Sequence, residues 1–241
     1  MFEIKVFDDA PELFEQVAEK MMALSFRDKP CHIALSGGST PMALYRFILN
    51  SPVKEGIQWS NVHFWWGDER MVPSDSAESN YGEAKRQFLD KLPIPAENLH
   101  PIDGAAESMG AELARLEKEL KHYVELYQGR PSFDWIILGV GEDGHTASLF
   151  PGAVDYDAEE NWVEAKHPET GQARISLSAE TLCNAQNISF LVTGSSKAEI
   201  LARLFEDDEE AEHYPAANVF AFEGETEWLL DEAAASKLVQ D

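Results

Sequence analysis

An apolar run, three glycines and a histidine follow one another in the segment Phe133-Asp-Trp-Ile-Ile-Leu-Gly-Val-Gly-Glu-Asp-Gly-His-Thr-Ala-Ser-Leu-Phe-Pro-Gly152. The run from Phe133 to Leu138 predicts a strand that is covered on both faces of its sheet. The glycines after it allow a tight turn and bring the backbone close to a ligand. Asp143 and His145 then follow the carboxyl end of the strand, the edge where open parallel sheets bind ligands. We expect His145 to be the base of an enzyme at this edge.

Strands and helices alternate on both sides of this segment. Short apolar runs predict strands at 2–7, 31–36, 62–66, 188–193 and 219–222, and apolar residues at helical spacing predict helices at 9–26, 40–49, 107–127, 194–205 and 232–239. The alternation predicts one α/β domain spanning residues 1–241, with a doubly wound, mostly parallel, Rossmann-like sheet and helices on both faces. Residues 162–165 and 174–178 predict a small antiparallel excursion, and 67–80 predict an irregular loop.

Composition excludes several classes of protein. The 241 residues are 44% hydrophobic, enough for a large core, and no apolar run is long enough to predict a membrane span. The formal net charge of −25 argues against nucleic acid or an anionic membrane as a partner, because phosphate backbones require a basic face. The first residues read as a strand rather than a signal peptide, so we expect a cytoplasmic protein. Cys31 and Cys183 predict buried free thiols, and no histidine pair has metal-ligand spacing on one helix face, so no metal is expected.

A second glycine turn joins a predicted strand to a predicted helix at Ser36-Gly-Gly-Ser-Thr-Pro41. Free backbone N–H groups and the helix dipole make such a turn an anion cradle, with Thr40 as the expected N-cap and Pro41 at the first helical position. We therefore expect Gly37, Gly38, Ser39 and Thr40 to bind phosphate. The alternative is an ordinary tight connection. The pattern is neither a nucleophile elbow nor a P-loop.

The glycines at 139, 141 and 144 formally match G-x-G-x-x-G after a strand. A dinucleotide site needs a long helix directly after these glycines, and Pro151 with Gly152 stops the chain within two turns. We therefore expect no nicotinamide or other cofactor.

Candidate cations come from three separate segments. Arg70 ends the motif Gly67-Asp-Glu-Arg70 after an apolar strand, and its planar fork suits a phosphate or a developing oxyanion. Asp68 in the same motif is a candidate second acid–base group, and a surface salt bridge is the alternative. Arg174 and Lys197 are the remaining candidates. Lys197 stands at a helix start, where a cation opposes the dipole and a bound anion would account for it.

These motifs together resemble the 6-phosphogluconolactonase family. The resemblance rests on Leu35-Ser-Gly-Gly-Ser-Thr-Pro41, Trp66-Gly-Asp-Glu-Arg-Met-Val-Pro73 with Ser79-Asn-Tyr81, Gly139-Val-Gly-Glu-Asp-Gly-His-Thr-Ala-Ser-Leu-Phe-Pro-Gly152 and Val192-Thr-Gly-x-x-Lys197. It implies hydrolysis of 6-phospho-D-glucono-1,5-lactone to 6-phosphogluconate in the oxidative pentose phosphate pathway, without metal or nucleotide. It also implies that the phosphate lies among residues 37–40, Arg174 and Lys197, with Arg70 serving either the phosphate or the oxyanion.

The sister family of glucosamine-6-phosphate deaminases is similar in the same loops. That family has a catalytic glutamate where this sequence has Phe150, and a phenylalanine cannot exchange protons. This difference counts against deamination, which is kept as the alternative activity. A non-catalytic sugar-phosphate sensor is a second alternative. On the lactonase interpretation, neutral His145 takes a proton from water, and Asp143 or Asp68 orients the imidazole. We expect a small-molecule sugar phosphate as the ligand and a monomer or weak dimer as the assembly.

Overall fold

Seven parallel strands form the main sheet of the computed structural model, which describes residues 2–206 and 211–238. Their spatial order is β1-β12-β11-β8-β2-β3-β5. The strands span Phe2–Phe7 (β1), Cys31–Leu35 (β2), Val62–Trp66 (β3), Leu99–His100 (β5), Trp135–Leu138 (β8), Asn187–Val192 (β11) and Glu225–Asp231 (β12). Every pairing between these neighbours is parallel, which confirms the predicted fold class.

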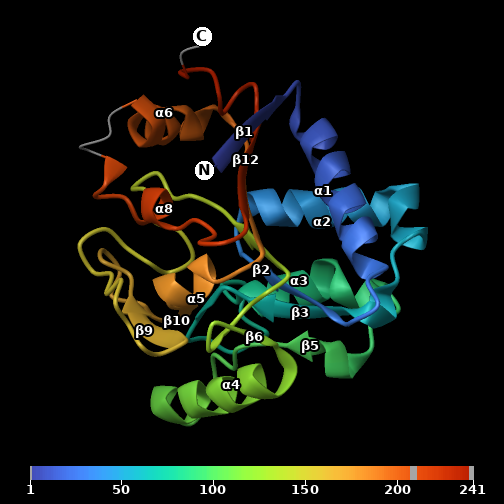
Figure 1. Ribbon diagram of the computed structural model, residues 1–241, viewed down its shortest axis with the longest axis vertical. Coiled ribbons are helices and arrows are strands. Elements are labelled where there is room, and N and C mark those ends of the chain that lie inside the picture. Colours follow the sequence, from blue (N-terminus) through green and yellow to red (C-terminus); the bar gives the residue numbers. More distant parts are fainter. Residues whose placement is uncertain (1, 207–210, 239–241) are drawn as a thin grey trace.

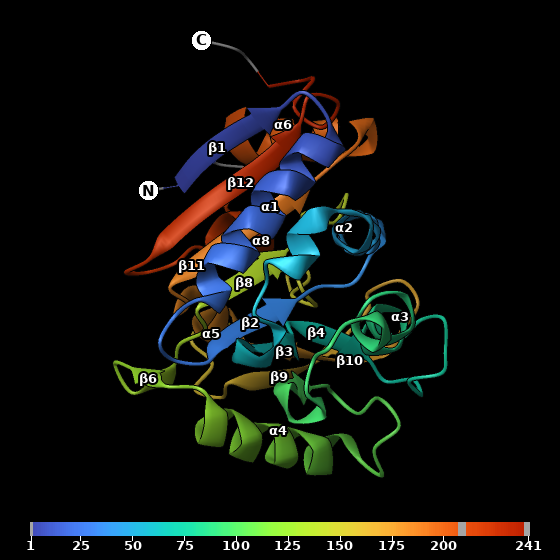
Figure 2. The same ribbon diagram turned by 90° about the vertical axis from the view of Figure 1, so that its right-hand side faces the viewer.

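Helices cover both faces of the sheet (Figure 1). On one side lie α1 (Ala10–Ser25) and α2 (Ser39–Asn50), which pack against each other, with α3 (Asn80–Gln87) beside α2. On the other side lie α5 (Ala179–Cys183), α6 (Ala198–Glu206) and α8 (Pro215–Asn218). Helix α4 (Met109–Tyr123) lies at the bottom of the molecule in Figures 1 and 2, where Glu119 contacts His100 of β5. Short 3-10 helices occupy Pro52–Glu55, Trp59–Asn61, Leu89–Lys91, Ala96–Asn98 and Ser195–Lys197.

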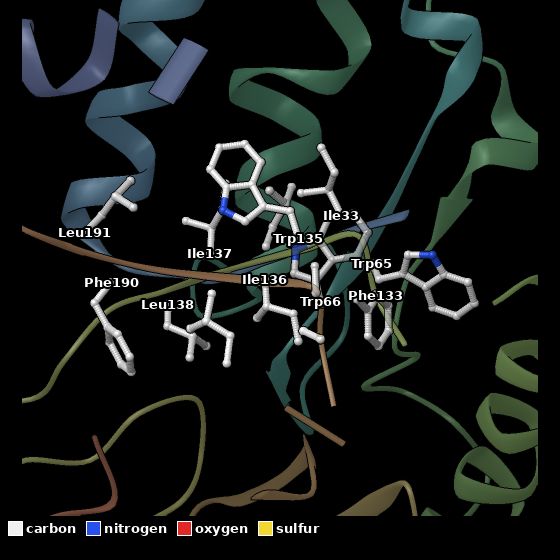
Figure 3. Close-up of a cluster of buried hydrophobic side chains, with 14 of the residues drawn as sticks. Ile33, Trp65, Trp66, Phe133, Trp135, Ile136, Ile137, Leu138, Phe190 and Leu191 are labelled. Atoms are coloured by element: carbon white, nitrogen blue, oxygen red, sulfur yellow. The ribbon is translucent and has the colours of Figure 1, made fainter. Parts of the chain in front are cut away.

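The core forms around the strand that opens the segment 133–152. All four residues of β8 are buried, as the unbroken apolar run predicts for a strand covered on both faces. Figure 3 shows these side chains beside Ile33 of β2 and Phe190 of β11. Burying each such large apolar side chain contributes about 1.5–3 kcal/mol to stability. The glycine turn that follows β8 is therefore attached to a fully buried strand.

The sheet has one topological switch point, between β2 and β8. From β2 the chain continues to β3 and β5 on one side, and from β8 it continues to β11 and β12 on the other. The connections after β2 and β8 therefore diverge and leave a crevice at the carboxyl ends of these two strands. Both glycine turns of the sequence begin at this crevice.

A three-stranded antiparallel sheet contains β4 (Asp68–Arg70), β10 (Ala173–Leu177) and β9 (Trp162–Lys166), and β6 (Leu126–Tyr127) and β7 (Arg130–Pro131) form a separate hairpin. The antiparallel excursion is confirmed. The prediction of an irregular loop over 67–80 is wrong for its first residues, because Asp68 pairs with Ser176 and Arg70 with Arg174. The strand forms only because its partner lies about a hundred residues away, and no local pattern announces that pairing.

The predicted C-terminal elements differ from the observed ones. Residues 219–222 are irregular, and the last strand is β12, in which Thr226 and the four residues from Trp228 to Asp231 are buried. The apolar run of β12 is short because Glu225, Glu227 and Asp231 flank or interrupt it, so the sequence does not announce this strand. Residues 232–238 form turns rather than a helix, with the Asp231 side chain accepting from the N–H of Ala234 at 2.7 Å. Val239 of the predicted helix lies outside the described residues.

Three buried histidines occupy adjacent strands at the β5 side of the sheet. The indole N–H of Trp65 donates to Nδ1 of His32 at 3.1 Å, and the rings of His32 and His63 lie 4.8 Å apart. His63 Nδ1 lies 2.9 Å from His100 Nε2, and His100 Nδ1 lies 2.8 Å from a carboxylate oxygen of Glu119. Because the indole can only donate, Nδ1 of His32 must accept, and protonating it there breaks this bond.

Burial and the neighbouring imidazoles lower the pKa of His32 from its ordinary value of 6.5 to about 3. Burial and the charge of His100 lower the pKa of His63 to about 4, although Glu97 acts in the opposite direction. Both groups are therefore neutral in the folded protein and protonate readily in the unfolded chain. The two neutral histidines contribute fully to the free energy of unfolding above pH 6.5, their pKa in the unfolded chain. This contribution is lost progressively as the pH falls from 6.5 toward their pKa values in the folded protein.

We predict that lowering the pH from 7 to 5 reduces the free energy of unfolding by up to about 2 kcal/mol for each of these two histidines. Urea unfolding at the two pH values measures the loss in the wild type and in His32→Gln, whose amide oxygen still accepts from Trp65. His32→Gln should be less sensitive to acid than the wild type, whereas the exposed His122→Gln should match the wild type. Equal acid sensitivity in His32→Gln and the wild type would contradict the prediction.

Candidate active site

A cavity of about 220 Å³ lies at the carboxyl ends of β2 and β8. Nine of the ten predicted site residues line it: Gly37, Gly38, Ser39, Thr40, Asp68, Arg70, His145, Arg174 and Lys197. The tenth, Asp143, contacts the side chain of His145. Residues from five separate segments of the chain therefore meet at the topological switch point of the sheet.

The imidazole of His145 is held by the carboxylate of Asp143. Nδ1 of His145 lies 2.5 Å from Oδ1 of Asp143, and the backbone N–H of His145 donates to the same oxygen at 3.2 Å. Burial acts to raise the pKa of Asp143, but the hydrogen bond and the charge of His145 outweigh it and lower that pKa to about 2. The carboxylate is thus ionised and fixes the tautomer that carries a proton on Nδ1, which leaves Nε2 able to accept a proton.

The turn that presents His145 depends on its glycines. The N–H of Gly141 donates to the carbonyl of His145 at 2.8 Å, and the hydroxyl of Thr146 donates to the carbonyl of Gly139 at 2.9 Å. A Cβ at Gly141 would lie 2.2 Å from Nδ1 of His145, so the residue at 141 must be glycine for the pair to form. Ala147, which lines the cavity, has a φ of 48°, an uncommon conformation for a residue with a side chain.

The first glycine turn differs from its prediction in detail. Helix α2 begins at Ser39 and its N-cap is Gly38, so the assignment of Thr40 as N-cap and Pro41 as first helical residue is wrong by two positions. Gly38 has a φ of 105°, which only glycine adopts readily, and the helix can therefore start earlier. No side chain caps α2, so its first N–H groups stay available to an anion. The hydroxyls of Thr40 and Thr193 lie 2.9 Å apart and join this turn to the segment before Lys197.

The two arginines lie opposite each other in the pairing of β4 with β10. Arg70 donates from Nη1 to the carbonyl of Glu78 at 2.6 Å, and Arg174 Nη1 lies 3.8 Å from a carboxylate oxygen of Asp68. Burial lowers the pKa of Arg174, although the Asp68 charge opposes the shift. The Nε atoms of both arginines are buried without a hydrogen-bond partner among the described residues. Lys197 has no ion pair within that part of the chain, so these cations retain donors for a ligand.

Asp68 lies deeper than His145 and is engaged by neighbouring side chains. Its Oδ2 accepts from the hydroxyl of Ser148 at 2.6 Å, and its backbone carbonyl accepts from the amide of Asn80 at 3.0 Å. Ser148 also lies 3.4 Å from Nη1 of Arg174. The carboxylate therefore neutralises part of the arginine charge at the floor of the cavity.

Two residues that sequence reasoning did not assign to the site support it. The buried carboxylate of Glu69 accepts from the N–H groups of Arg70, Asn80 and Tyr81 and from the hydroxyl of Ser79. Burial raises the pKa of Glu69, although these hydrogen bonds oppose the shift. Glu69 thus ties β4 to the start of α3 and delivers Asn80 to the cavity wall.

Asn80 packs directly against the first glycine turn. A Cβ at Gly37 would lie 1.8 Å from the amide oxygen of Asn80. The signal for this residue was present in Ser79-Asn-Tyr81, where a capping serine precedes a polar residue at a helix start, but nothing local indicates that Asn80 meets Gly37.

The described residues contain neither the helix of a dinucleotide site after Gly144 nor a cluster of metal ligands. After Gly144 the chain forms turns and an isolated bridge between Thr146 and Leu149, where a dinucleotide site would place a helix. Within residues 2–206 and 211–238, no group of three or more His, Cys, Asp or Glu side chains is placed to hold a metal ion. No helix in the described part of the chain is long and apolar enough to cross a bilayer.

Comparison with known proteins gives consistent matches over nearly the whole chain. Residues 8–228 match the family described as glucosamine-6-phosphate isomerases/6-phosphogluconolactonase. The chain is 47% identical over 232 residues to a 6-phosphogluconolactonase of Haemophilus influenzae, covering 96% of this chain and 98% of that protein. A 6-phosphogluconolactonase of Synechocystis is 36% identical, with 86% of this chain and 84% of that protein covered.

Solved structures agree with these sequence matches. The crystal structure of devB protein has a TM-score of 0.95 and 46% identity, covering 99% of this chain and 100% of that one. The structure of 6-phosphogluconolactonase from Trypanosoma brucei has a TM-score of 0.84 and 30% identity, covering 99% of each chain. The predicted family and fold are therefore confirmed.

We predict that Gly141→Ala separates the His145 imidazole from Asp143, because the new Cβ would lie 2.2 Å from Nδ1 and 2.4 Å from Oδ1. The measurements are a crystal structure of the variant and the NMR resonance of the Nδ1 proton. Gly139→Ala is the matched control, since a Cβ there meets nothing within 4 Å. An intact His145–Asp143 hydrogen bond in Gly141→Ala would show that the turn can adjust and that glycine is not required.

Proposed function

Because the chain belongs to the family of glucosamine-6-phosphate isomerases and 6-phosphogluconolactonases, we propose that it hydrolyses 6-phospho-D-glucono-1,5-lactone to 6-phospho-D-gluconate. The observation that carries the proposal is the pairing of His145 with Asp143 in a cavity that also contains Arg70, Arg174 and Lys197. The pair supplies a general base, and the cations suit a substrate that is a phosphate ester and develops an oxyanion.

The proposed reaction is the transfer of an acyl group from the ring oxygen to water. Nε2 of His145 accepts a proton from a water molecule as its oxygen adds to the lactone carbonyl carbon. The tetrahedral intermediate then expels the ring oxygen, which takes the proton back from the imidazolium, so the ring opens to a hydroxy acid. Asp143 holds the imidazole and stabilises its charged form, and no covalent nucleophile is needed because the substrate is an activated ester.

The cavity offers donors for the substrate phosphate and for the carbonyl oxygen, which becomes an oxyanion when water adds. The phosphate is proposed to bind at the N-terminus of α2 through Gly38, Ser39 and Thr40, with Lys197 beside it, since the Thr40–Thr193 contact joins these two segments. Arg70 and Arg174 lie together on paired strands and both line the cavity, so their guanidinium groups are proposed as donors for the phosphate or for the carbonyl oxygen. Asp68 is proposed to orient Arg174 through Ser148 rather than to exchange protons.

Deamination of glucosamine 6-phosphate is disfavoured by Phe150. Its buried phenyl ring lies 5.0 Å from the His145 ring and supplies no proton donor or acceptor at that position. Release of ammonia from glucosamine 6-phosphate distinguishes the two activities, and we expect none above background.

We predict that the protein accelerates disappearance of the lactone in a coupled assay in which glucose 6-phosphate dehydrogenase generates it. His145→Ala should lower kcat by ~10²–10⁴-fold, because the reaction loses its general base. The exposed His122→Ala should keep the wild-type kcat. An unchanged kcat in His145→Ala would remove His145 from the mechanism, and an inactive wild type would refute the proposed function.

We predict that Lys197→Ala mainly weakens substrate binding, by about 1.5–3 kcal/mol, or roughly ten- to a hundredfold in KM, because a charge-assisted bond to phosphate is lost. Steady-state kinetics separate KM from kcat. Lys121→Ala, on the exposed side of α4, is the matched control. A change in melting temperature without a change in KM would mean that Lys197 has a structural role only.

A further inference from the structure

The ring of Phe150 contacts two cavity residues that have different proposed tasks. It is 2% exposed, and its centroid lies 5.0 Å from that of the His145 imidazole at an interplanar angle of 48°. The guanidinium carbon of Arg174 lies over the same ring, 5.5 Å from its centroid. His167 meets the ring edge-on at 5.2 Å. Phe150 is not among the residues that line the cavity, so it forms a second layer behind the imidazole and the guanidinium.

Neither partner of Phe150 is fully held by its polar contacts. Asp143 binds His145 at Nδ1, which leaves the ring free to rock about that hydrogen bond unless something packs against its face. Arg174 lies at 3.4 Å from Ser148, 3.4 Å from Gln172 and 3.8 Å from Asp68, all long contacts, and its Nε has no partner among the described residues. The phenyl ring packs against both groups.

Phe150 is itself rigid. Its backbone carbonyl accepts from the N–H of Ala153 at 3.1 Å, and Thr146 and Leu149 form a bridge just before it. The same short turn therefore fixes His145 and Phe150 relative to each other, five residues apart.

We propose that Phe150 is a positioning residue that holds the His145 imidazole and the Arg174 guanidinium in a fixed mutual arrangement. This inference rests on the proposed lactonase function, because its consequences appear in that reaction. The face of the ring carries the cation–π contact with Arg174, while the imidazole of His145 packs against the same ring at an angle of 48°. One aromatic side chain thereby links the proton-transfer group to a group that binds the anionic substrate.

The test replaces the ring by an aliphatic side chain. Phe150→Leu should lower kcat by about 3- to 30-fold, the worth of a buried cation–π contact, and should also raise KM. The rise in KM distinguishes positioning from loss of folded protein, which lowers the apparent kcat alone. Phe150→Tyr should retain most of the activity, since the ring also borders a neighbouring cavity of about 330 Å³ that has space for a hydroxyl.

Phe133→Leu is the matched control, because Phe133 is equally buried and lies near the opposite end of β8, against Trp65. It should lower the melting temperature about as much as Phe150→Leu and leave kcat and KM unchanged. Phe150→Met, whose flexible side chain fills irregular gaps and has no ring, replaces Phe150→Leu if the latter does not fold.

A spectroscopic readout is independent of turnover. The ring current of Phe150 should shift the NMR resonances of the His145 ring protons in the wild type, and the shift should disappear in Phe150→Leu and persist in Phe150→Tyr. Wild-type values of kcat and KM in Phe150→Leu, or no change in these resonances, would overturn the positioning role while wild-type turnover and the loss in His145→Ala still support the lactonase. An inactive wild type would instead refute the proposed function.

Discussion

The hydrogen bond between His145 and Asp143 is the interaction on which the site depends. It exists because Gly141 leaves space for the imidazole and because the hydroxyl of Thr146 donates to the carbonyl of Gly139, which closes the turn. The turn itself directly follows the buried strand β8. The pairing keeps Asp143 ionised and leaves the other ring nitrogen available. The chemistry we propose for the cavity follows from this one geometry, since a water molecule needs a neutral acceptor of defined direction.

A second constraint is electrostatic. The chain carries a formal net charge of −25, yet Arg70, Arg174 and Lys197 line one cavity. Their mutual repulsion is reduced by Asp68 at the cavity floor, and burial makes the remaining positive potential stronger than it would be in water. An anionic ligand that enters this cavity would neutralise the positive charges of these three side chains, which the acidic residues elsewhere on the described surface do not pair with. The local field thus opposes the global one at the place where the proposed substrate binds.

Much of the site was visible in the sequence because it lies in short motifs at strand ends. The two glycine turns, the histidine and Arg70 were candidates because they follow predicted strands, and the rule that parallel strands share one carboxyl edge predicts their convergence. Arg174 lies in the antiparallel strand β10, and only the family resemblance implied that it joins Lys197 at the phosphate. The start of α2 was misplaced because the conformation of Gly38 is not encoded in the identity of Thr40 or Pro41. The strand β12 was missed because its charged residues interrupt the apolar run that signals a buried strand.

The sequence by itself determined the α/β alternation, the family and the candidate residues, since these depend on local propensity and on motifs read along the chain. Only the tertiary structure decided which groups touch. It selected Asp143 over Asp68 as the partner of His145, set Arg70 against Arg174 through the pairing of β4 with β10, and put Asn80 against Gly37. The physical reason is that such contacts join segments far apart in the chain, and their geometry depends on how the whole core packs rather than on any nearby residue.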